Sequence, residues 1–170
     1  VPVDAALPGM HYAARSIKHS IEEALGPEGQ AAQINVGLTS IELVDIRIAA
    51  PKGWPADTTL RAKRVVIVPD LRHLMSEHVE ITRVSVEGGY LSALRPRDGG
   101  GLKVLPSIAE RAKKRGRDSE ERRGARVHTV ALAGTVIELF DAAGPGTTKL
   151  RIDGVKGTIK DIRTPELDTR

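Results

Sequence analysis

Apolar residues recur along the chain in an alternating pattern that slips once by one position. The first example is Ile41–Ile48 (IELVDIRI), with apolar residues at Ile41, Leu43, Ile46 and Ile48. The same spacing returns in three further segments, Leu60–Ile67, Val79–Val86 and Leu150–Gly157, the last with glycine in the final apolar place. Alternation predicts a strand with one buried face, and a β-bulge absorbs such a slip while bending the strand. The pattern predicts a curved sheet with one continuous apolar concave face, and coincidence among β-rich segments is the alternative.

Helical periodicity appears at the start of the chain. Apolar residues at three- and four-residue steps predict an amphipathic helix over Met10–Leu25, and Gly26 followed by Pro27 favours a stop there. Two shorter helices are expected over Asp70–Glu77, with Asp70 as its cap, and over Pro106–Lys114. The expected strands are Gln33–Leu38, Ile41–Ala49, Leu60–Val68, Val79–Val86 with a continuation over Tyr90–Leu94, Val127–Leu132, Thr135–Phe140, Lys149–Val155 and Thr158–Ile162.

The order of these elements predicts an α+β fold. An N-terminal amphipathic helix is followed by a strongly curved, mainly antiparallel sheet with short crossover helices. Strands that come as adjacent pairs with short loops favour an antiparallel meander over βαβ units. We expect residues 1–9 to be the tail of an excised N-terminal segment, 10–110 the helix plus curved sheet, 111–126 a basic flexible linker, and 127–170 a continuation of the same sheet in a fragment of a longer protein.

Composition narrows the chemistry further. Apolar residues make up 40% of the 170 residues but aromatic ones only 2%, so the apolar surface consists of Val, Ile, Leu and Ala. The chain has no cysteine, which excludes disulfides and cysteine-based catalysis or metal binding. No stretch approaches the roughly 18 consecutive apolar residues of a membrane span. The sequence contains no HExxH pattern, no Gly-x-Ser-x-Gly elbow and no P-loop. We therefore expect that the chain is not an enzyme and that it binds no metal and no cofactor.

The net charge of +4 belongs to one segment. Arg111–Arg126 holds eight basic and three acidic residues, so the rest of the chain is close to neutral. Three interpretations remain open for this segment: a solvated linker, contact with anionic lipid headgroups, or binding to nucleic acid or another polyanion. No aromatic residue is interleaved for base stacking, which argues against nucleic acid. The headgroup or polyanion candidates are Arg111, Lys113, Lys114, Arg115 and Arg117.

Several segments together resemble the AsmA family of bacterial envelope proteins. The similarity covers roughly Ala13 to Pro165, and its motifs are degenerate but ordered. The segments that carry it are GLTSIELVDIRIAAPKGW (Gly37–Trp54), TLRAKRVVIVPDLRHLMSEHVEITRVSVEGGYLSALRPRDGG (Thr59–Gly100), Leu102–Ile108, VALAGTVIELFDAAGPG (Val130–Gly146) and LRIDGVKGTIKDI (Leu150–Ile162). The chain departs from the family pattern at Gly88-Gly89, where Gly-Pro is usual, and in the strongly basic run after Arg111.

This resemblance implies a periplasmic protein anchored in the inner membrane by an N-terminal helix that is missing here. It also implies similarity to the chorein domain of bridge-like lipid-transfer proteins, whose curved sheet holds acyl chains. The expected function is therefore lipid handling, implicated in phospholipid transport between membranes and outer-membrane homeostasis, with phospholipid or acyl chains and envelope proteins as partners. The lipid-groove candidates are Ile41, Leu43, Ile46, Ile48, Val65, Ile67, Val79, Ile81, Val84 and Val86, of which one subset lines the groove and another packs under the N-terminal helix.

Two other functions stay open at this point. The same curved sheet could serve as a structural or interaction module of an envelope protein that binds no lipid. A more distant alternative is a basic nucleic-acid-binding domain that uses the segment Arg111–Arg126. An aliphatic groove is chemically suited to lipid tails, because apolar contact is non-directional and scales with area.

Overall fold

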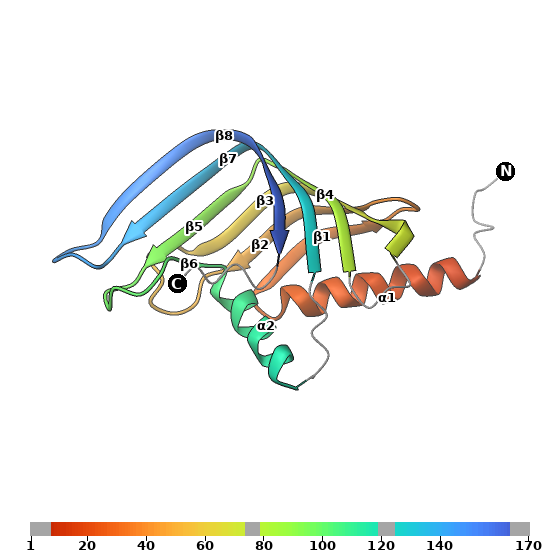
Figure 1. Ribbon diagram of the computed structural model, residues 1–170, viewed down its shortest axis with the longest axis horizontal. Coiled ribbons are helices and arrows are strands. Elements are labelled where there is room, and N and C mark those ends of the chain that lie inside the picture. The colour runs from red at the N-terminus through yellow and green to blue at the C-terminus, as the bar shows by residue number, and fades with distance from the viewer. Residues whose placement is uncertain (1–7, 74–78, 119–124, 164–170) are drawn as a thin grey trace.

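A computed structural model describes residues 8–73, 79–118 and 125–163 as a mixed β-sheet that arches over two helices (Figure 1). The sheet supplies most of the described residues, which agrees with an α+β class. The elements are α1 (Pro8–Leu25), β1 (Gly29–Val36), β2 (Ile41–Ala49), β3 (Thr58–Pro69), a 3-10 turn η1 (Leu71–His73), β4 (Val79–Glu87), β5 (Tyr90–Arg95), β6 (Lys103–Val104), α2 (Pro106–Asp118), β7 (Ala125–Asp141) and β8 (Thr148–Arg163).

The strands run in the order β1, β2, β3, then β4 and β5 in one line, then β7 and β8. β4 and β5 both lie between β3 and β7, so Tyr90–Arg95 does continue the preceding strand, as expected from the sequence. β7 pairs parallel with both of them. The sheet is mainly antiparallel, as expected, but the preference for a meander over βαβ units is wrong at this point. The chain leaves β5, passes through α2 and returns in the same direction, which is a parallel crossover.

The strands bend along a line of residues that we call the crease: Asp45, Lys63, Gly88, Gly134 and Gly154. The register places Asp45 between the pairs Val44–Arg64 and Ile46–Ala62, and so opposite Lys63. Asp45 has a φ of 49°, and the three glycines have φ values between 59° and 65°, all in the left-handed region. Glycine adopts this region without a steric penalty, and aspartate tolerates it better than most residues.

The crease accounts for three of the four slips in the hydrophobic pattern. Asp45, Lys63 and Gly154 lie within the slips of β2, β3 and β8. The fourth slip, in β4, belongs to a second irregularity: Val68 faces Arg83 and Pro69 faces Ile81, which leaves Thr82 as an extra residue. Three of the four slips therefore lie at the same height in neighbouring strands, and the sheet is irregular at two heights rather than one.

Several strand boundaries differ from those expected. The first strand begins at Gly29 and ends at Val36, instead of covering Gln33–Leu38, and Leu38 lies in the following turn with 74% of its surface exposed. The expected pairs Val127–Leu132 with Thr135–Phe140, and Lys149–Val155 with Thr158–Ile162, are the single strands β7 and β8. Glycine in the left-handed region bends these strands without ending them.

The charged segment is also organised differently. Residues 111–118, expected in a flexible linker, form the C-terminal part of α2, and β7 already begins at residue 125. Residues 119–124 lie outside the described residues, as do most of the expected crossover helix after η1 (74–78) and the two tails (1–7 and 164–170).

The core lies between α1 and the sheet. Leu43, Ile46, Ala62 and Val65 form its buried centre, and Ile21 and Leu25 of α1 pack against them. These four residues span the slips of β2 and β3 yet share one face, because the crease restores the alternation. The core is small, since only seven apolar side chains are buried among the described residues.

Candidate functional site: an aliphatic face under the arch

Cross-strand register places aliphatic side chains in unbroken rows across the sheet, because directly opposed residues share a face. One row runs from Ile41 on β2 through Ile67, Val84 and Val130 to Ile159 on β8. We call the whole surface the aliphatic face. Its members are Ala31, Ile34, Ile41, Leu43, Ile46, Ile48, Leu60, Ala62, Val65, Ile67, Val84, Val86, Leu91, Ala93, Val130, Leu132, Ile137, Leu139, Leu150, Ile152 and Ile159.

The aliphatic face passes from a closed core to an open surface. At β2 it lies under α1, where Leu43 is only 5% exposed. At β8 the exposed fractions are 55% for Leu150, 42% for Ile152 and 49% for Ile159. In Figure 1, α1 crosses beneath one end of the arch, and the first half of β8, which carries Leu150 and Ile152, extends beyond it. Ile159 lies past the crease, opposite Val130, on the edge strand. The uncovered end presents aliphatic side chains on the concave side of a bent sheet.

Eight of the ten groove candidates belong to this face, with different degrees of burial, and the other two, Val79 and Ile81, lie at the start of β4. Leu43, Ile46 and Val65 are core residues under α1, and Ile48 is 1% exposed. Four others are partly buried around that core: Ile41, Ile67, Val84 and Val86. Ile81 is half-buried opposite Pro69, and Val79 begins β4. The side chain of Val79 lies outside the described residues. Three of the candidates, Leu43, Ile46 and Val65, therefore belong to the core that α1 covers.

The open end consists of residues that the groove prediction did not include. Leu150, Ile152 and Ile159 come from β8, and Val130, Leu132, Ile137 and Leu139 from β7. The signal for β8 was present in the sequence, because Leu150–Gly157 carries the same slipped spacing as β2. What the sequence could not supply was the register, which aligns these residues with the rows of β2 and β3.

A half-open pocket of about 430 Å³ lies between the end of α1 and β1. Its walls are partly aliphatic, from Leu25, Ala31 and Ile34, and partly polar, from Glu22 and Gln30. This volume is within the range of pockets that hold small ligands. The pocket adjoins the aliphatic face, because Ala31 and Ile34 stand opposite Ile46 and Leu43.

The basic candidates lie on α2. Arg111 forms an ion pair with Glu28 and donates a hydrogen bond to the Ala24 carbonyl at 3.4 Å, so it ties α2 to the end of α1. This structural role removes Arg111 from the groups that face solvent. Lys113 and Lys114 are exposed. Arg115 and Arg117 belong to the same helix, and their side chains lie outside the described residues.

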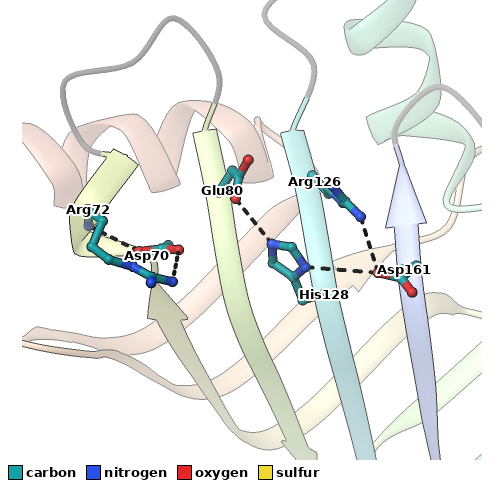
Figure 2. A network of polar contacts seen from close by, with 6 residues as sticks. All are labelled: Asp70, Arg72, Glu80, Arg126, His128 and Asp161. Carbon is teal, nitrogen blue, oxygen red and sulfur yellow. Dashed lines mark hydrogen bonds and ion pairs between the residues drawn. The ribbon is translucent and has the colours of Figure 1, made fainter.

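Two polar contacts organise the end of β3. The Asp70 carboxylate, 8% exposed, accepts a hydrogen bond from the Arg72 backbone N–H at 3.0 Å, which confirms its role as a cap. It also accepts two bonds from the Arg72 guanidinium, at 3.1 and 3.0 Å (Figure 2). This bidentate pair fixes the start of the connection to β4.

A second polar group joins the ends of β4, β7 and β8. His128 Nε2 lies 3.2 Å from a Glu80 oxygen, and its Nδ1 lies 3.9 Å from an Asp161 oxygen (Figure 2). Arg126 contacts the same Asp161 oxygen at 3.5 Å. These contacts span the second irregularity of the sheet, where Asp161 has a φ of 57°. They tie the outermost strand to its neighbours.

The opposite side of the sheet, which we call the outer face, carries a polar network. The Tyr90 hydroxyl donates to Glu138 at 2.7 Å, and Glu138 also pairs with Lys149 at 2.9 Å and Arg151 at 3.1 Å. The Arg61 guanidinium lies 4.8 Å above the centroid of the Tyr90 ring. Burial and the bond to Glu138 raise the pKa of Tyr90 to about 12. The hydrogen bond from Tyr90, followed by those from Lys149 and Arg151, lowers the pKa of Glu138.

Within residues 8–73, 79–118 and 125–163, no group of three or more histidine, aspartate or glutamate side chains is arranged to hold a metal ion. Neither helix of those segments is long and apolar enough to cross a membrane. The chain matches no model of a known protein family and no curated protein. The aliphatic face is the candidate site, because it joins the core to exposed aliphatic side chains on β8.

Proposed function

We propose that this chain handles lipids by holding acyl chains against the aliphatic face. The observation that carries the proposal is the continuity of that face from a core under α1 to exposed Leu150, Ile152 and Ile159 on β8. Apolar burial contributes roughly 25 cal/mol per Å² of surface removed from water, without any directional group. A hydrocarbon chain that lies along the aliphatic face is stabilised by apolar burial over its whole length.

The small buried core supports this proposal over a simple structural role. A chain of 170 residues is long enough to bury a substantial core. Here, however, many aliphatic side chains on the concave side are only partly buried, including Val84, Val86 and the three on β8. Contiguous exposed apolar surface of this kind marks a binding site in a soluble domain. An acyl chain would cover it.

The biological setting is also a proposal. The resemblance to the AsmA family favours a periplasmic protein held at the inner membrane, acting in phospholipid transport between membranes and in outer-membrane homeostasis. The exposed Lys113 and Lys114 of α2 suit contact with an anionic headgroup. Lipid transfer of this kind needs positioning and apolar contact but no catalytic residue.

The alternative is a structural or interaction module without lipid. The same exposed aliphatic residues would then cover a protein surface, and the purified chain would carry no lipid. The polar outer face, with its network around Glu138, gives the sheet the rigidity that a scaffold needs. The two functions differ in what fills the concave side.

A pair of neighbouring substitutions separates these functions. Ile159→Lys places a charge on the aliphatic face where the side chain is 49% exposed, so the fold should survive. Thr158→Lys is the matched control, because Thr158 is exposed and points to the outer face beside Ala131. We expect Ile159→Lys to lose most of the retained lipid and Thr158→Lys to keep it, as measured by mass spectrometry of solvent extracts. Equal lipid content in both variants, with circular dichroism unchanged, would contradict the proposal.

A further inference from the structure

Among the described strands, β8 is the last of the sheet and one of the longest. β8 has 16 residues and pairs only with β7 among the described strands. Such an edge presents a row of unpaired backbone N–H and C=O groups, which is a template for a further strand. β8 carries two features that protect sheet edges, irregularities at Gly154 and Asp161 and several lysines, but it has no proline and no charge on its aliphatic side.

The side chains of β8 define what kind of strand fits. On one side, Leu150, Ile152 and Ile159 are exposed members of the aliphatic face. On the other, Lys156 and Lys160 are exposed and have no carboxylate within ion-pair distance in the described part of the chain. Lys160 lies opposite Thr129 on the outer face, and Lys156 joins it there by strand alternation. β8 is aliphatic on one side and cationic on the other.

The charge of β8 disfavours a second copy as the occupant. Thr148–Arg163 contains five basic residues and two acidic ones. Two paired β8 strands would together bring six more positive than negative charges to the new interface, and like charges that stand opposite each other are destabilising. A strand that places carboxylates opposite Lys156 and Lys160 forms favourable cross-strand pairs instead.

We propose that the β8 edge binds an extended polypeptide strand from a partner protein, with aliphatic side chains on the concave side and carboxylates on the outer side. Main-chain hydrogen bonds to β8 supply affinity, and the alternating side chains supply specificity. The added strand extends each row of the aliphatic face by one residue. This inference does not depend on lipid binding, because it rests on the edge and its charges.

The test uses the whole chain and two synthetic peptides of roughly ten residues, the length of a long strand. One peptide alternates valine with glutamate, and the other alternates valine with lysine. We expect only the glutamate peptide to bind in fluorescence anisotropy and to slow amide hydrogen exchange in β8. The double variant Lys156→Glu/Lys160→Glu should weaken that peptide about tenfold and favour the lysine peptide, because two cross-strand charge pairs change sign.

Three results would overturn the inference. The first is equal binding of both peptides, or binding that leaves β8 exchange unchanged. The second is a concentration-dependent dimer that protects β8 on its own, measured by analytical ultracentrifugation, which would assign the edge to a second copy. The third is protection of β8 by phosphatidylglycerol vesicles but by neither peptide, which would assign it to a lipid surface. Circular dichroism of the double variant checks that the fold is retained.

Discussion

The substitution Gly154→Ala tests whether the crease bends the sheet. Gly154 has a φ of 65°, and a Cβ added there would meet no atom within 4 Å, so the change acts on the backbone alone. An L-residue in the left-handed region costs about 1–2 kcal/mol. The lower entropy of the unfolded alanine chain offsets about 0.4–1 kcal/mol. We expect a net loss of about 1 kcal/mol in the free energy of unfolding.

Gly157→Ala is the control on the same strand. Gly157 also has open space around its Cα, but its φ is outside the left-handed region. Alanine there should leave the protein unchanged or stabilise it by up to about 1 kcal/mol. In urea unfolding with an m-value of about 1–3 kcal/mol per M, Gly154→Ala should lower the midpoint by about 0.5 M. Equal midpoint changes in the two variants would refute the crease as a backbone device.

Two further predictions concern the core and the outer face. Leu43→Ala should cost about 3 kcal/mol, because Leu43 is 5% exposed, whereas Leu150→Ala should cost under about 1 kcal/mol, because Leu150 is 55% exposed. Equal losses in urea unfolding would mean that the β8 end is packed. In a tyrosine absorbance titration, Tyr90 should ionise near pH 12 instead of 10, and Glu138→Gln should shift that pKa downward. Since the folded pKa lies above the unfolded one, this tyrosine's contribution to stability is lost as pH rises from 10 to 12, and an unchanged titration in Glu138→Gln would disprove the coupling.

The bends could be predicted from the sequence because they leave a trace in side-chain spacing. A strand that shifts its alternation once must place an extra residue somewhere, and Asp45 and Gly154 occupy those places in the left-handed region. The parallel pairing of β7 left no such trace. Short loops favoured a meander, and the crossover through α2 depends on contacts between segments far apart in sequence.

The site could be predicted only in part for the same reason. The slipped spacing identified the apolar set of β2, β3 and β4, but burial depends on where α1 lies. Leu43 became core and Ile159 became open surface, although both belong to the same kind of pattern. Arg111 shows the converse: its charge suggested a ligand, and its ion pair with Glu28, 83 residues away in sequence, made it a structural link.

Native mass spectrometry of the purified chain, followed by solvent extraction and lipid identification, tests the central claim most directly. The proposal predicts phospholipid bound at a fixed stoichiometry, and its loss in Ile159→Lys. A folded, lipid-free protein that takes up no phospholipid from vesicles would contradict lipid handling by the aliphatic face, and would favour the interaction module.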